Sequence, residues 1–136
     1  MSNPENQPRS AEGTPAPLVF VVDDVVELGE MLEVMLTRSG YETRVFSHPL
    51  RALEALATAD PKPRLLVSDF RMPDINGLEL IHRCKLIHPT LKVIAASANI
   101  IEEDLEKYPL RPDRILAKPY STDALLAAVK ALLPSP

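Results

Sequence analysis

The sequence predicts a single α/β domain built on a five-stranded parallel sheet, and two observations support this fold class. The chain has 136 residues, of which 46% are hydrophobic and 25% charged, the balance of one ordinary globular domain. From Leu18 onward, short apolar runs alternate with longer segments of helical period, as in βα units around a parallel sheet. At this length roughly two thirds of the unfolded surface can be buried, so the core needs no disulfide or structural metal.

Residues 1–17 are expected to form a disordered tail, and residues 18–133 the domain. The tail holds four of the fourteen prolines and almost no large apolar residue. It therefore has nothing to bury in exchange for the entropy lost on ordering.

The first strand is predicted at Leu18–Val22, a continuous apolar run typical of a strand covered on both faces. The helix that follows carries one apolar stripe at i, i+3, i+4, i+7 and i+8, made of Leu28, Met31, Leu32, Met35 and Leu36. Gly40 is expected to end this helix in the left-handed conformation. The more alternating run Tyr41–Phe46 predicts an edge strand.

The middle of the chain continues the alternation. Pro49 can open a second helix, whose apolar residues are Leu50, Leu53, Leu56 and Ala57. Leu65–Val67 predicts a third strand that ends at Ser68-Asp69. Leu78, Ile81 and Cys84 then share one face of a third helix, which stops before Pro89.

The last third predicts two more strands and two helices. Leu91–Ala96 and Arg114–Ala117 are the strands, and a short fourth helix is expected at Ile100–Tyr108. The closing helix repeats the five-position stripe with Leu125, Ala128, Val129, Leu132 and Leu133.

Chemically capable groups follow four of the five predicted strands directly. They are Asp23 with Asp24, then Asp69, Ser97 and Lys118. Because the carboxyl ends of parallel strands lie at one edge of a sheet, and open α/β folds bind ligands there, we expect these groups to converge.

Three carboxylates at close range repel one another unless a cation lies among them. With oxygen ligands and no His or Cys, the hard ions Mg²⁺ or Mn²⁺ are favoured over Zn²⁺. An Asp carboxylate can attack phosphorus to form an aspartyl-phosphate, and a Lys and a Ser hydroxyl can bind the phosphoryl oxygens. The pattern therefore favours a phosphoryl-transfer site.

Simpler interpretations exist for each residue alone. Asp23 and Asp24 could cap the first helix, and Asp69 could be a turn residue. The three histidines, none at a strand end, are interpreted as solvated or capping; they are His48, His82 and His88. Cys84 is interpreted as a small buried hydrophobic residue. Only the joint placement of the four strand-end groups favours a site.

Composition excludes several classes of function. The net charge is −4, and no Lys/Arg cluster stands out in the sequence, so electrostatic binding to nucleic acid is not expected. The apolar run Leu18–Val22 is too short to span a membrane, and no leader precedes it. The single cysteine agrees with a reducing compartment. A cytoplasmic protein without direct nucleic-acid or membrane contact is the expectation.

Four motifs resemble the receiver domain of two-component response regulators, over about residues 17 to 133. They are Val22-Asp23-Asp24, the run Ser68-Asp69-Phe70-Arg71-Met72-Pro73-Asp74-Ile75-Asn76-Gly77, Ala96-Ser97-Ala98, and Ala117-Lys118-Pro119-Tyr120. The resemblance implies a flavodoxin-like (CheY-like) sheet of order 2-1-3-4-5 flanked by five helices. The chain could be a single-domain response regulator or the receiver domain of a hybrid histidine kinase.

The same resemblance implies roles for the site residues. Asp69 would be the phospho-acceptor, and Ser97 and Lys118 would hold the phosphoryl group. Asp24, Asp69 and the backbone carbonyl of Arg71 would bind Mg²⁺, with Asp23 on a metal-bound water. The Lys118–Pro119 bond would be cis, and Gly77 would let the preceding loop turn into its helix.

The sequence departs from the family pattern at positions that bear on how the domain passes its signal to a target. Relatives carry an aromatic switch residue three positions before the site lysine, where this chain has Ile115. The expected fourth helix is interrupted by Pro109 and Pro112. These departures suggest signalling through another surface, or phosphoryl relay. Arg71 and Asn99 flank the mouth of the site and are expected to tune the lifetime of the phosphoryl group.

The sequence thus predicts a phospho-accepting signalling module whose only chemistry is its own phosphorylation and autodephosphorylation. Its donor would be a phosphohistidine on a histidine kinase or a histidine phosphotransfer protein, and its downstream target another protein. Because the chain ends after the closing helix, no covalent output domain is expected. Two alternatives stay open: a receiver-like binding module that is not phosphorylated, and an Mg²⁺-dependent aspartyl-phosphate phosphohydrolase. The latter class generally needs Asp-x-Asp after its first strand, whereas Asp23 and Asp24 are adjacent.

Overall fold

A computed structural model describes residues 16–71, 75–98, 106 and 109–133. Most of the expected tail, residues 1–15, lies outside the described residues. No helix in the described part of the chain is long and apolar enough to cross a membrane.

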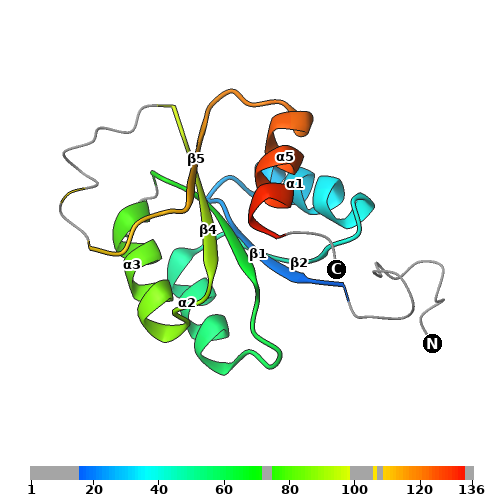
Figure 1. The fold of residues 1–136 in the computed structure, drawn as a ribbon. Coiled ribbons are helices and arrows are strands. Elements are labelled where there is room, and N and C mark those ends of the chain that lie inside the picture. Colours follow the sequence, from blue (N-terminus) through cyan, green and yellow to red (C-terminus); the bar gives the residue numbers. More distant parts are fainter. Residues whose placement is uncertain (1–15, 72–74, 99–105, 107–108, 134–136) are drawn as a thin grey trace.

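Five parallel strands form one sheet, as the sequence predicted. They are β1 (Leu18–Val22), β2 (Glu42–Phe46), β3 (Leu65–Asp69), β4 (Lys92–Ser97) and β5 (Arg114–Ala117). Their order is β2-β1-β3-β4-β5, so β2 and β5 are the edge strands (Figure 1). β2 pairs only with β1 and is partly exposed, which explains its alternating sequence.

Four helices cover the sheet within the described residues, rather than the five expected. They are α1 (Val26–Arg38), α2 (Pro49–Thr58), α3 (Gly77–Ile87) and α5 (Thr122–Leu132). The helix expected at residues 100–108 falls outside the described residues except for Glu106. α1 and α5 lie on one face of the sheet, and α2 and α3 lie on the other (Figure 1).

The core has two layers because residues alternate across β1. Phe20 and Val22 pack with α2 and α3, whereas Val19 and Val21 pack with α1 and α5. All five residues of β1 are buried, as its continuous apolar run predicted.

Local signals fix the helix ends where the sequence placed them. Gly40 has φ 98°, the left-handed conformation that closes the turn after α1. Pro49 opens α2, and the His48 side chain accepts a hydrogen bond from Leu50 N at 3.2 Å. Asn76 caps α3 by accepting from Glu79 N at 2.8 Å. Of the three histidines, His48 is therefore a capping residue.

The predicted buried face of two helices was partly wrong. In α1 the buried residues are Gly29, Leu32 and Leu36, whereas Leu28 and Met31 are 37% and 49% exposed. Gly29 fixes this orientation, because a Cβ there would lie 2.7 Å from Val45 Cγ1, so the helix packs on β2 through its glycine. In α2 the buried residues include Ala52, and Leu50 is exposed.

Candidate functional site

The carboxyl edge of the sheet brings the predicted residues together. The register pairs Val22 with Ser68, Asp69 with Ala96, and Ser97 with Ala117. The residues that follow β1 and β5 therefore lie beside the ends of β3 and β4. This edge gathers side chains that are almost a hundred residues apart in sequence.

Three carboxylates form a cluster at this edge. Asp23, Asp24 and Asp69 each offer one oxygen, and these oxygens lie within 4.8 Å of one another. Oxygen ligands of an octahedral Mg²⁺ at about 2.1 Å are themselves roughly 3–4 Å apart, so small side-chain adjustments would suffice to share one ion. Asp23 is buried, Asp69 is half-buried and Asp24 is exposed, which leaves one side open to solvent. The cluster fits a hard divalent cation.

Asp23 is the most buried of these carboxylates, at 4% exposed. Burial raises the pKa of this carboxyl above its ordinary value, and the neighbouring Asp69 and Asp24 raise it further. The Val25 N–H, which donates to Asp23 Oδ1 at 2.9 Å, and the Lys118 ammonium act on the pKa in the opposite direction. Burying a carboxylate here disfavours its charge, and a bound cation would compensate for that cost.

The helix-cap interpretation of Asp23 and Asp24 does not describe the structure. The cap residue of α1 is Val25, and no side chain caps that helix. The bond that Asp23 accepts from Val25 N instead holds the carboxylate at the end of β1.

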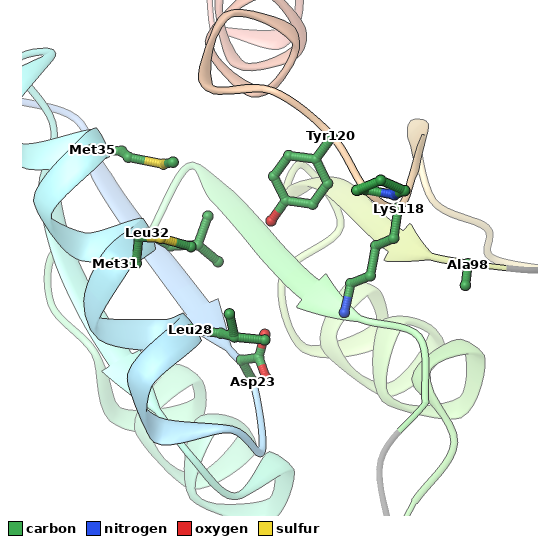
Figure 2. Close-up of a pocket in the computed structure, with 9 residues that line it drawn as sticks. Asp23, Leu28, Met31, Leu32, Met35, Ala98, Lys118 and Tyr120 are labelled. Carbon is green, nitrogen blue, oxygen red and sulfur yellow. The ribbon is translucent and has the colours of Figure 1, made fainter.

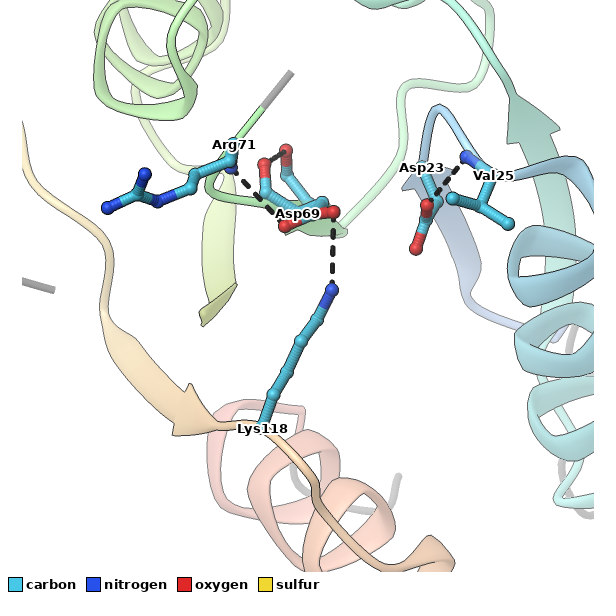
Figure 3. A network of polar contacts seen from close by, with 6 residues as sticks. Asp23, Val25, Asp69, Arg71 and Lys118 are labelled. Atoms are coloured by element: carbon cyan, nitrogen blue, oxygen red, sulfur yellow. Dashed lines mark hydrogen bonds and ion pairs between the residues drawn. The ribbon is translucent and has the colours of Figure 1, made fainter. Parts of the chain in front are cut away.

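Asp69 lies at the end of β3 with different partners on its two oxygens. Lys118 Nζ lies 3.2 Å from Oδ2, and the Arg71 backbone N–H donates to Oδ1 at 3.3 Å (Figure 3). The Arg71 side chain points away from this carboxylate. The Asp69 and Lys118 side chains are 13% and 28% exposed, so the ion pair is accessible from one side.

Ser97 and Lys118 are tied to each other through the backbone. The Lys118 N–H donates to the Ser97 carbonyl at 2.9 Å, which extends the β4–β5 pairing by one residue. Ser97 is 4% exposed at the end of β4. The Lys118–Pro119 bond is cis. Both residues therefore lie at the same edge as Asp69.

Gly77 places the first turn of α3 directly against the end of β3. The Gly77 N–H donates to the Phe70 carbonyl at 2.8 Å. A Cβ at Gly77 would lie 2.6 Å from Phe70 O and 3.0 Å from Asp69 O. The resemblance implied that this glycine lets the preceding loop turn into α3, and the structure adds that it permits close backbone contact with Phe70.

Of two other predicted residues, the structure describes Ile115 but not Asn99. Ile115, at the expected switch position, is 46% exposed on β5. Asn99 lies outside the described residues, as do Met72, Pro73 and Asp74 of the run that follows Asp69. The Arg71 carbonyl remains a prediction as a metal ligand.

No pattern in the sequence indicated that a hollow lies beside the site. A cavity of about 360 Å³ separates α1 from the β5–α5 connection. Its lining comprises Asp23, Leu28, Met31, Leu32, Met35, Ala98, Lys118, Pro119 and Tyr120. Tyr120 directs its hydroxyl into the space between α1 and Lys118 (Figure 2). Burial raises the pKa of this phenol, and the Asp23 and Asp69 carboxylates raise it further.

Comparison with known proteins gives a consistent result. The family model described as the response regulator receiver domain matches residues 19–130. The chain is 36% identical over 113 residues to the DNA-binding transcriptional regulator NtrC of Proteus hauseri, covering 82% of this chain and 24% of that protein. It is 29% identical over 120 residues to the sporulation initiation phosphotransferase F of Bacillus subtilis, covering 85% and 93%. The chain thus spans about a quarter of the length of its NtrC relatives.

Solved structures share the fold. The chemotaxis protein CheY4 of Vibrio cholerae superposes with a TM-score of 0.79 at 21% identity, covering 87% of this chain and 99% of that one. The receiver domain of Francisella response regulator 1452 gives a TM-score of 0.74 at 27% identity, covering 85% and 95%.

Proposed function

Because the chain belongs to the response regulator receiver domain family, we propose that Asp69 accepts a phosphoryl group from a phosphohistidine on a partner kinase or phosphotransfer protein. Receiver domains serve phosphorylation-based signalling in two-component systems and are signalling domains rather than enzymes. For this chain we further propose which residue accepts the phosphoryl group, which kind of group donates it and which ion binds beside it.

The chemistry is a transfer between two nucleophiles. An Asp69 carboxylate oxygen forms a bond to phosphorus, the P–N bond to the donor imidazole breaks, and the imidazole nitrogen takes a proton from solvent. Asp24 and Asp69 would hold Mg²⁺ or Mn²⁺ with the Arg71 carbonyl as a further ligand, and Asp23 would bind a water on the ion. When bound, the ion neutralises charge on the phosphoryl oxygens. Lys118 would bind a second phosphoryl oxygen and Ser97 a third.

The observation that carries the proposal is the contact of Lys118 Nζ with Asp69 Oδ2 at 3.2 Å beside two further carboxylates. A turn aspartate needs neither a lysine partner nor neighbouring carboxylates. A phosphoryl acceptor needs both, because a cation and an ammonium must balance the incoming negative charge.

The donor would approach over α1. Its phosphohistidine must reach Asp69, so its surface has to cover the rim of the site. Exposed apolar residues of this rim include Val26 at 50%, Leu28 at 37% and Met31 at 49%, next to the hollow that contains Asp23 and Lys118. A helix of the donor, packed on these side chains, would bury them while presenting its histidine.

Output would occur through altered protein binding or phosphoryl relay. The added group carries roughly −1.5 to −2 charges and three acceptor oxygens, enough to reorganise the loops around Asp69. Ile115 cannot supply the rotating aromatic ring, so the β5 surface would respond differently from that of relatives. The NtrC relatives are DNA-binding regulators; for this chain we propose action in the cytoplasm, without direct contact with nucleic acid.

The test is intact mass after incubation with Mg²⁺ and phosphoramidate, whose P–N bond matches that of phosphohistidine. Wild type should gain one phosphoryl group, and Asp69→Asn and an EDTA control should gain none. The matched control is Asp123→Asn, because Asp123 is exposed in the first turn of α5, outside the cluster. Labelling of wild type without metal, or of Asp69→Asn, would refute the assignment. A well-folded wild type that gains nothing would favour the unphosphorylated binding module.

A further inference from the structure

A second hollow lies at the opposite edge of the sheet, away from Asp69. It has a volume of about 330 Å³ and is lined by Lys62, Arg64, His88, Thr90, Lys92, Leu132 and Leu133. Arg64 immediately precedes β3, and Lys92 is the first residue of β4. The Lys92 N–H donates to the Arg64 carbonyl at 3.1 Å, which fixes these two cationic residues side by side.

This hollow is strongly basic in a chain whose net charge is −4. Two lysines, an arginine and a histidine line it, and none of the described residues that line it is acidic. Arg64 and Lys92 are exposed, and neither forms an ion pair with a carboxylate of the described residues. Their charges are therefore available to a ligand.

Backbone contacts hold the other two basic groups without neutralising them. Lys62 Nζ donates to the Leu56 carbonyl at 2.8 Å and to the Ala59 carbonyl at 3.4 Å. His88 Nε2 lies 3.0 Å from the Pro63 carbonyl. These bonds fix the direction of both side chains and leave Lys62 one further N–H donor.

We propose that this hollow binds a small organic phosphate. A phosphate dianion matches a group of neighbouring cations better than a single carboxylate does, and a guanidinium can bind two phosphate oxygens at once. The Thr90 hydroxyl adds a neutral donor. Leu132 and Leu133 supply an apolar wall against which a sugar or a base can pack. The inference is independent of phosphoryl acceptance at Asp69, because the two sites lie at opposite ends of the strands.

The experiment is an amide NMR titration of the full chain in EDTA. The probes are pyrophosphate, adenosine 5′-monophosphate and a tri-aspartate peptide. Pyrophosphate and the nucleotide should give saturable shifts at the amides of Arg64, Thr90 and Lys92, with the nucleotide adding shifts at Leu133. Shifts confined to Val25, Arg71 and Lys118 would place the anion at the Asp69 edge and overturn the proposal. Tri-aspartate binding as tight as that of pyrophosphate would overturn the preference for phosphate.

Variants that remove positive charge inside and outside the hollow provide a matched comparison of pyrophosphate affinity. The double variant Arg64→Gln/Lys92→Gln should weaken pyrophosphate binding by roughly tenfold or more, because both side chains are exposed and the fold does not depend on them. The control Arg51→Gln removes an exposed cation of α2 that does not line the hollow, and it should change affinity less than about twofold. Equal weakening in both proteins, or no saturation below about 10 mM pyrophosphate, would refute the site.

Discussion

Replacing Gly77 by alanine tests how α3 positions the end of β3 and Asp69. The glycine φ lies outside the left-handed region, so alanine can adopt the backbone conformation. Its Cβ, however, would lie 2.6 Å from Phe70 O and 2.7 Å from Phe70 Cα. Both are backbone atoms, so relief requires α3 to move away from Phe70 by at least about 0.4 Å.

The magnitude follows from two opposing effects. Overpacking against fixed atoms costs about 1–3 kcal/mol, and the better helix propensity of alanine returns at most about 1 kcal/mol. We expect Gly77→Ala to lower the free energy of unfolding by about 1–2 kcal/mol. Since the displaced Phe70 adjoins Asp69, phosphorylation should also slow by about 3- to 10-fold, in line with the sensitivity of transfer to sub-ångström misplacement.

The assay pairs urea unfolding with the phosphorylation rate, and Gly40→Ala is the matched control. A Cβ at Gly40 would meet nothing within 4 Å, but its φ of 98° strains any other residue. Gly40→Ala should therefore lose about 1 kcal/mol of stability while accepting phosphate at the wild-type rate. If Gly77→Ala is as stable as wild type, or slows phosphorylation no more than Gly40→Ala, the close-contact argument fails.

Three further predictions concern the site and the core. Lys118→Ala should change the free energy of unfolding by less than about 1 kcal/mol, because its ion pair is partly exposed. The same substitution should slow phosphorylation by roughly 10²-fold. A wild-type rate would exclude a role of Lys118 in transfer. Mg²⁺ at about a hundred times its Kd should stabilise wild type by about 2.7 kcal/mol, and Asp24→Asn should lose most of this gain without changing stability in EDTA, as thermal melting would show. Burial raises the pKa of Cys84 to about 12, so iodoacetamide at pH 8 should label only unfolded protein. Above the ordinary thiol pKa the unfolded chain binds fewer protons than the native one, so the free energy of unfolding should fall as pH rises. Fast labelling of the native protein by iodoacetamide would contradict the raised pKa of Cys84.

Strand-end residues were predictable because a parallel sheet converts sequence order into position. Asp69 and Lys118 are separated by many residues, yet each directly follows or ends a short apolar run. Once those runs are assigned to parallel strands, convergence at one edge follows without side-chain detail. The burial of Cys84 was equally predictable from the sequence, because the other residues on its face of α3 are apolar.

Features that depend on which face an element presents were not predictable. The stripe of α1 includes both Leu28 and Leu32, and only packing against β2 through Gly29 decides that Leu32 is buried. The basic hollow is a similar case, because Lys62, Arg64 and Lys92 form no run in the sequence. Lys62 and Arg64 are two residues apart, and Lys92 joins them only when β3 and β4 pair. The contact of Gly77 with Phe70 likewise depends on backbone geometry rather than on residue type.

The dispersal of the site along the chain has a consequence for its synthesis. Asp69 is made before Lys118, and at about 5–20 residues per second roughly 2–10 s separate them on the ribosome. During that interval the nascent chain holds Asp69, Asp23 and Asp24 but lacks the ammonium that pairs with Asp69. The charge pair at Asp69 is therefore complete only once the chain has been made through Lys118.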